Sequence, residues 1–195
     1  MRFRLFSFSA VVWFALLIPA LSAQTEPVAK LIGVKEIFGG YAYLSNSFNS
    51  HTGFRGPGLN GWDAAAAFPI ARNLGVKVEG LGFYGNSLGY AQDAHFFLAG
   101  GQYTQRFSNE SVFVHGLAGI GHINTEALTL GGEGPSSNFA LAADGGGGLD
   151  TPISKRMAWR VEGALLYANF TPASNQIHST PNYFARISTG IVWRF

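Results

Sequence analysis

The strongest constraint on the fold lies in residues 183–195, which alternate in polarity with a period of two. One set of alternate residues is apolar and runs from Tyr183 to Phe195, whereas the other is small or polar and includes Arg186 and Arg194. Because successive side chains on a strand point to opposite faces, this pattern predicts a strand with one apolar and one polar face. Its length suits the roughly 9–11 residues that a tilted strand needs to cross a bilayer.

Seven further segments show the same alternation. The eight predicted strands are 35–44, 60–70, 75–85, 94–107, 112–121, 139–149, 157–170 and 183–195. The connections between them alternate between short turns and longer loops, the loops being 45–59, 86–92, 122–138 and 171–182. Short periplasmic turns and longer extracellular loops are typical of membrane barrels. The sequence therefore predicts an all-β fold, an eight-stranded antiparallel up-and-down transmembrane β-barrel.

The start of the chain has the pattern of a cleavable signal peptide. A basic end precedes an apolar run over 5–21, and small residues follow before Gln24. This arrangement is typical of secretory leaders, although a transmembrane anchor is the alternative. We expect cleavage after Ala23 or, alternatively, after Ser22. The predicted organisation is a signal peptide over 1–23, an irregular lead-in over 24–34 and a barrel domain over 35–195.

Charge content favours a lipid-facing exterior. Charged residues make up 12% of the chain, about half of the ~25% that is usual in soluble domains. Loss of the two arginines in the leader leaves 13 − 2 = 11 basic residues against 11 acidic ones. A balanced charge of this kind gives no basic patch for nucleic acid. The absence of cysteine excludes disulfides and cysteine-based zinc sites.

Aromatic residues on the apolar face gather toward the strand ends, as in the interfacial belts of membrane proteins. The predicted belts contain Tyr41, Tyr43, Trp62, Tyr84, Tyr167 and Tyr183 on the loop side, and Phe68, Tyr103, Phe107, Trp159, Trp193 and Phe195 on the turn side. A soluble, lipocalin-like barrel would instead turn its apolar face inward. The belts therefore favour a membrane barrel whose polar face lines the lumen.

Charges of both signs lie on the polar face. They are Glu36, Asp63, Lys77, Glu79, Arg106, Asp144, Arg160, Glu162, Arg186 and Arg194. An eight-stranded barrel is barely wide enough for its own side chains, so paired charges would plug it. Since unpaired buried charges are costly, we expect Glu79, Arg160, Glu162 and Arg186 to share one network. Ion conduction through the lumen is the alternative.

These features together resemble the OmpA/OmpX-type outer-membrane β-barrel superfamily of diderm bacteria. The matching segments are the leader Met1–Ala23, Gly39–Tyr43 in the first strand and the closing Ile191–Phe195. The resemblance implies an outer-membrane location with lipid and lipopolysaccharide as surroundings. It also implies that the barrel-assembly machinery reads the closing strand, with Phe195 and its neighbour Trp193 as the signal. Larger members add a peptidoglycan-binding domain, which we do not expect here.

The sequence offers few candidates for catalysis. Some outer-membrane barrels of this size modify lipids, and the 3-O-deacylases among them place a serine two residues after a histidine. Here Asn124 follows His122 at that spacing, so we expect an interfacial histidine and no enzyme. We interpret His115 as an inward polar residue. The remaining histidines are His51, His95 and His178, on or beside loops, and they predict no metal site or cofactor.

Three functions follow from these observations. The first is a structural or surface-interaction barrel whose loops contact an extracellular ligand that the sequence does not identify. The second is a small, porin-like pore or transport barrel. The third, which the spacing at His122 disfavours, is a lipid-modifying enzyme. Loops on rigid scaffolds commonly carry function, so we favour the first.

Overall fold

A computed structural model describes residues 34–45, 58–87, 90–127, 136–170 and 180–195. The strands are β1 (Glu36–Leu44), β2 (Leu59–Pro69), β3 (Leu74–Ser87), β4 (Tyr90–Arg106), β5 (Ser111–Ala127), β6 (Ser136–Pro152), β7 (Met157–Phe170) and β8 (Thr180–Arg194). The predicted signal peptide and nearly all of the predicted lead-in lie outside the described residues. The parts of the predicted loops at 46–57, 128–135 and 171–179 lie outside them as well.

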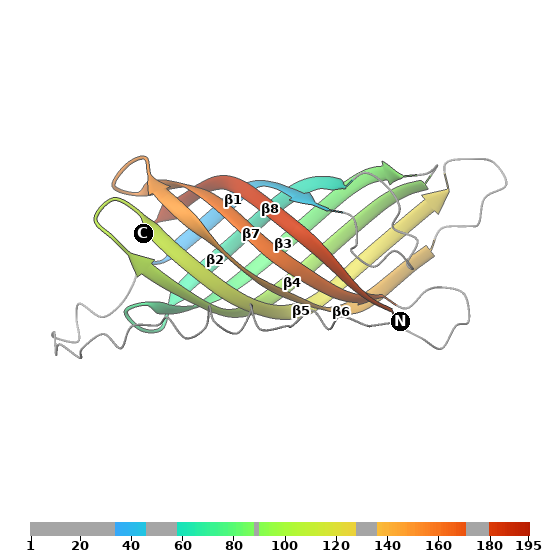
Figure 1. Ribbon diagram of the computed structural model, residues 1–195, viewed down its shortest axis with the longest axis horizontal. Helices are drawn as coiled ribbons and strands as arrows, with labels where there is room; N and C mark the ends of the chain where they lie inside the picture. Colours follow the sequence, from blue (N-terminus) through green and yellow to red (C-terminus); the bar gives the residue numbers. More distant parts are fainter. Residues whose placement is uncertain (1–33, 46–57, 88–89, 128–135, 171–179) are drawn as a thin grey trace, which may run out of the picture.

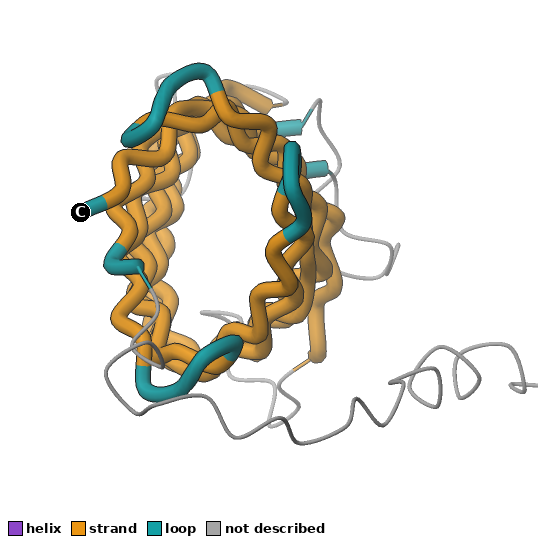
Figure 2. The backbone as a smooth tube through the Cα atoms, turned by 90° about the vertical axis from the view of Figure 1, so that its left-hand side faces the viewer, coloured by secondary structure: helices purple, strands orange, loops and turns teal. Residues whose placement is uncertain are grey.

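The eight strands form one closed antiparallel barrel (Figures 1 and 2). Each strand pairs with its neighbour in sequence, and β8 closes the ring by pairing with β1 from Glu36↔Arg194 to Leu44↔Arg186. Closure removes the unpaired edges that an open sheet would expose. The predicted fold class is therefore confirmed. No helix long and apolar enough to cross a membrane occurs among the described residues.

The strands are strongly staggered around the ring. Following paired residues from Tyr41 through β2, β3, β4 and β5 leads to Phe139 on β6. Following them through β8 and β7 leads instead to Leu149 on the same strand. The offset of 149 − 139 = 10 residues is the stagger that accompanies strand tilt in a closed barrel. As a result, β4, β5 and β6 reach furthest toward the loop side (Figure 1).

The alternation of side chains follows the prediction on every strand. On β5, for example, Val112, Val114 and Ile120 are exposed, whereas Phe113 and Leu117 are buried inside the barrel. Apolar residues therefore cover the outer surface of the sheet, as expected of a surface that faces lipid.

Two connections differ from the prediction. The loop predicted at 122–138 is shorter, because the β5–β6 ladder continues through His122↔Phe139 to Thr125↔Ser136. The segment 86–92 is not a loop, because the β3–β4 ladder continues through Gly85↔Gln92 to Ser87↔Tyr90 and leaves only 88–89 between the strands. Polar residues such as Gln92 and Asn86 extend the ladder here because a strand needs backbone pairing rather than an apolar sequence. The strict alternation of long loops and short turns is therefore wrong at this hairpin.

The glycine run of β6 makes room for interior side chains. A Cβ on Gly148 would lie 2.3 Å from the Val161 carbonyl oxygen and 2.8 Å from the Phe113 ring. The space is instead filled by Phe113, over which the Arg160 guanidinium lies at 4.1 Å from the ring centroid. Glycine at this position thus lets a large ring and a cation occupy one layer of a narrow barrel.

Candidate functional site

The barrel interior carries a first group of ionic contacts at its turn side, the end with the short turns and the C-terminus. Arg160 donates to both carboxylate oxygens of Asp150 at 2.7 and 2.8 Å and to Glu36 at 3.0 Å. Arg194 bridges the same two acids, at 2.7 Å from Asp150 and 3.1 Å from Glu36. Arg106 lies 3.4 Å from Glu36 and is partly exposed at the rim. We call these five residues the turn-side cluster.

A second group fills the middle of the lumen and is organised around Arg186. This guanidinium contacts carboxylates from four strands, namely Asp63 at 2.6 Å, Glu79 at 3.4 Å, Asp144 at 3.2 Å and Glu162 at 2.7 Å. Arg186 is only 1% exposed although it is one of the longest side chains in the protein. A buried arginine is stable only when its donors are paired in this way. Arg186 therefore ties β8 to β2, β3, β6 and β7.

Lys77 and His115 complete the central cluster, which we define as these two residues, Arg186 and its four acids. Lys77 lies 2.7 Å from Glu79 and 3.2 Å from Glu162. The Nε2 atom of His115 lies 2.7 Å from Asp144 and 3.9 Å from Glu162. All of these side chains are fully buried. The central cluster thus spans the lumen from β3 and β5 to β7 and β8.

The ionic groups of the interior nearly balance in charge. The two clusters contain six acids and five lysine or arginine residues, a difference of 6 − 5 = 1, with His115 as an additional polar partner of Asp144. Such near balance is what the burial of many ionic groups requires, since an uncompensated buried charge is costly.

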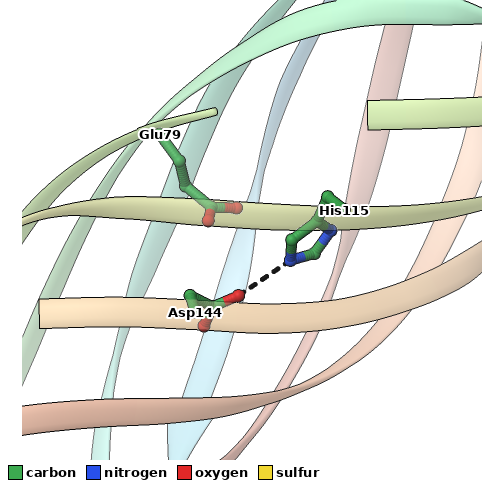
Figure 3. Close-up of side chains that lie close together, drawn as sticks. All are labelled: Glu79, His115 and Asp144. Atoms are coloured by element: carbon green, nitrogen blue, oxygen red, sulfur yellow. Dashed lines mark hydrogen bonds and ion pairs between the residues drawn. The ribbon is translucent and has the colours of Figure 1, made fainter. Parts of the chain in front are cut away.

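Three members of the central cluster have the composition of a metal site. Single ligand atoms of Glu79, His115 and Asp144 lie within 4.8 Å of one another (Figure 3). Arg186 contacts both of these acids, however, and Lys77 contacts Glu79. Protein cations already occupy the positions that a metal ion would take, so the arrangement is that of an ion-pair network.

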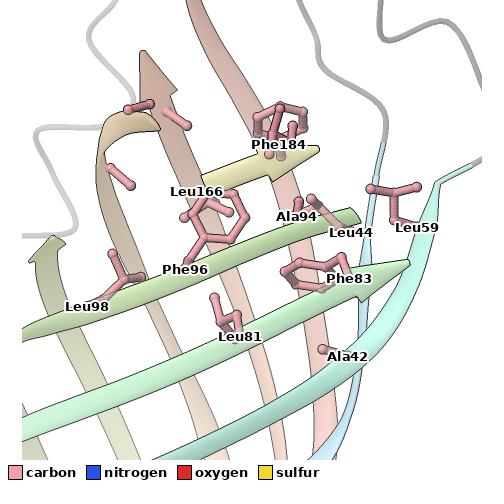
Figure 4. Close-up of a cluster of buried hydrophobic side chains, with 14 of the residues drawn as sticks. Ala42, Leu44, Leu59, Leu81, Phe83, Ala94, Phe96, Leu98, Leu166 and Phe184 are labelled. Carbon is pink, nitrogen blue, oxygen red and sulfur yellow. The ribbon is translucent and has the colours of Figure 1, made fainter. Parts of the chain in front are cut away.

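The loop-side half of the lumen is lined mainly by apolar side chains, with Gln92 and Asn182 as buried polar residues near its loop end. Its buried residues include Ala42, Leu44, Leu59, Leu81, Phe83, Ala94, Phe96, Leu98, Leu166 and Phe184 (Figure 4). Leu44 and Leu59 stand at the loop ends of β1 and β2, and the rings of Phe83 and Phe96 meet edge to face at 6.2 Å. We call this group the apolar half. The charges that the sequence places on the inward face end halfway along the barrel, which the alternation of residues did not predict.

The structure brings the predicted lumen charges together in two groups rather than one. Glu79, Glu162 and Arg186 meet in the central cluster, but Arg160 lies in the turn-side cluster with Glu36 and Arg106. The expected single network of four residues is therefore wrong for Arg160. Asp150, which was not among the predicted lumen charges, joins the turn-side cluster, and the inward His115 joins the central cluster.

The predicted belt residues make contacts across neighbouring strands on the outer face. The Trp62 indole donates to the Tyr84 hydroxyl at 3.3 Å, and Tyr41 donates to Asn60. The rings of Tyr167 and Tyr183 lie 5.3 Å apart, and the Trp159 indole donates to Thr189 at 2.7 Å. Tyr43, Tyr103, Trp193 and Phe195 are exposed on the same surface. Rings with a polar tip suit the boundary between hydrocarbon and headgroups.

Comparisons by sequence find no counterpart, since neither a family model nor a curated protein matches the chain. Comparison of structures does find similar proteins. The crystal structure of Neisserial surface protein A matches with a TM-score of 0.63 at 12% identity, over 84% of this chain and 99% of that chain. The crystal structure of Ail, the attachment invasion locus protein of Yersinia pestis, matches with a TM-score of 0.58 at 16% identity and the same coverage.

The chain has the fold of the eight-stranded outer-membrane barrels. The resemblance to OmpA/OmpX-type barrels that the sequence predicted is thereby confirmed for the fold. In such an outer-membrane-type barrel, the loop side faces outward and the turn side faces the periplasm.

The outer face of this barrel carries one polar contact that sequence spacing did not reveal. The Nε2 atom of His122 on β5 lies 2.8 Å from the Oγ atom of Ser137 on β6. The hydroxyl sought two residues after His122 is supplied by the next strand instead. His95, which the sequence placed on or beside a loop, lies within β4 directly opposite His122. A single sequence does not give the register between strands, so this pair could not be predicted from it.

Proposed function

We propose that the protein is an integral barrel of the outer membrane of a diderm bacterium, exported by its predicted signal peptide, with a structural or surface-interaction role. The observation that carries this proposal is the filled lumen. Arg186 with its four carboxylates crosses the middle of the barrel, and Phe83 and Phe96 lie in the apolar half above it. A barrel whose interior is occupied in this way serves as a scaffold for its surface rather than as a channel.

The partners of such a scaffold follow from its surfaces. The exposed belts, including Trp159 and Tyr183, suit lipid and lipopolysaccharide. The loops that the sequence predicts are the part that we propose for an extracellular ligand. Trp193 and Phe195 at the end of the closing strand are exposed and are the proposed signal for the barrel-assembly machinery. A pore is the competing function, and nothing among the described contacts favours it.

The proposal is tested on the full chain expressed in a Gram-negative host. We expect the mature protein in the outer-membrane fraction of a density gradient, and a gel mobility that shifts on boiling. Liposomes that contain the folded protein should swell in small-sugar solutions no faster than empty liposomes. Recovery in the soluble periplasmic fraction would refute the membrane role. Rapid swelling, with the boiled protein as a negative control, would support the pore instead.

A further inference from the structure

The pair formed by His122 and Ser137 has the geometry of a nucleophile and its base. In the tautomer that carries its proton on Nδ1, His122 accepts at Nε2 a hydrogen bond from the Ser137 hydroxyl, with 2.8 Å between Nε2 and Oγ. Ser137 is exposed, so its oxygen is accessible from outside the barrel. The His122 ring lies against the Phe139 ring, with centroids 4.4 Å apart. This contact holds the imidazole beside the hydroxyl, as a general base requires.

Its position on the barrel selects the class of substrate. His122 stands opposite His95, whose ring meets Tyr84 edge to face at 5.5 Å. The Tyr84 hydroxyl accepts a hydrogen bond from the Trp62 indole, so the pair belongs to the loop-side aromatic belt. Belts of this kind sit at the level of lipid headgroups. The ester bonds that join acyl chains to their headgroups lie at that same boundary between hydrocarbon and water.

We propose that Ser137 and His122 form a catalytic dyad that hydrolyses acyl esters of lipids in the outer leaflet. Ser137 Oγ bonds to the ester carbonyl carbon while its proton passes to His122 Nε2. The ester bond breaks, the leaving alcohol takes that proton, and an acyl-serine remains. Water then attacks the acyl-serine, His122 again receives and returns the proton, and the fatty acid is released as the serine is restored. Each step uses only the lipid and water.

This proposal departs from the expectation, drawn from the sequence, that the chain is not an enzyme. It is independent of the scaffold role, because the dyad lies on the outer face and shares no residue with the lumen clusters. No described carboxylate contacts His122, so within the described residues the site is a dyad rather than a triad. General-base assistance in such sites contributes about 10²–10⁴-fold to the rate.

The first test is covalent labelling of the folded protein in detergent by a fluorophosphonate probe, with the modified residue located by mass spectrometry. We expect label on Ser137, loss of label in Ser137→Ala, and at least about tenfold slower labelling in His122→Gln. The matched control is Thr189→Ala, which removes an outward hydroxyl on β8 far from the dyad. Thr189→Ala should label like the parent. A boiling-dependent gel shift shows that each variant is folded.

The second test identifies the ester. Folded protein is mixed with vesicles of phosphatidylethanolamine and phosphatidylglycerol, or with the same vesicles containing lipid A, and released fatty acid is quantified. Release from the first vesicles points to glycerophospholipid esters, and release only with lipid A points to acylated saccharide. The proposal is overturned if folded parent protein releases no fatty acid from either vesicle. It is also overturned if label falls elsewhere, or if His122→Gln labels and hydrolyses at the parental rate.

Discussion

The two halves of the barrel interior fill the same narrow space by different means. In the turn-side and central clusters, Arg160 and Arg186 are each satisfied by acids from other strands. In the apolar half, Phe83 and Phe96 contribute volume and can be replaced by other side chains of similar size. The charged part therefore ties particular strands together across the lumen, whereas the apolar half excludes water without selecting partners. We expect substitutions to be tolerated very differently in the two halves.

The largest effect is expected where one cation serves several acids. Arg186→Met leaves four buried carboxylates with Lys77 and His115 as their remaining partners. We expect a loss of about 3–5 kcal/mol in the free energy of unfolding, because removing one member of a buried ion pair leaves its partners as uncompensated buried charges. Urea unfolding from lipid vesicles, followed by tryptophan fluorescence, measures it. The matched control is Arg106→Met at the partly exposed rim, expected to cost about 0–1 kcal/mol. Equal losses would show that Arg186 does not organise the interior.

A charge placed on the outer face tests whether the interior alone accommodates ions. Ile187 follows Arg186 on β8 but is exposed on the outer face in mid-strand. Ile187→Arg should lower the free energy of unfolding in vesicles by about 2–4 kcal/mol, since lipid offers no counter-ion. Ile153→Arg in the exposed turn between β6 and β7 is the control and should cost about 0–1 kcal/mol. A harmless Ile187→Arg would contradict the assignment of this face to lipid.

Near-isosteric substitutions in the two halves give the finest comparison. Asp150→Asn weakens three close contacts to Arg160 and Arg194 in a cluster that already has more cations than acids. We expect a cost of about 2–3 kcal/mol, as for hydrogen bonds between charged groups. Leu81→Met in the apolar half conserves volume and should cost less than about 1.5 kcal/mol. The same vesicle unfolding assay compares them, and a larger loss for Leu81→Met would reverse the proposed division of roles.

Much of this architecture could be predicted because the polarity of neighbouring residues alternates along each strand. The period of two located all eight strands and the facing of residues such as His115 and Asp144. What depends on pairing between strands could not be predicted. The separation of Arg160 from Arg186, the contact of Ser137 with His122 and the continued β3–β4 ladder all follow from register. Register is fixed by hydrogen bonding across the sheet, which a single sequence does not specify.

The apolar half was missed for a different reason. Leu81 and Phe83 follow Lys77 and Glu79 on the same inward face of β3. The two charged residues suggest a polar lumen along the whole strand, although the two apolar residues lie inward as well. The strand tilt places these four residues at successive depths in the lumen. Depth, rather than facing, therefore separates the charged part from the apolar half.

We propose that the lumen is closed to ions, and single-channel recording in planar bilayers is the most direct test of this closure. The folded protein inserted into a bilayer in 1 M KCl should give no regular conductance steps at moderate voltage. We expect the charged clusters and the apolar half, which both fill the lumen, to obstruct the path of an ion between the two ends of the barrel. Stable, repeated steps of one size, absent with heat-unfolded protein, would contradict the account and would make the interior a pore.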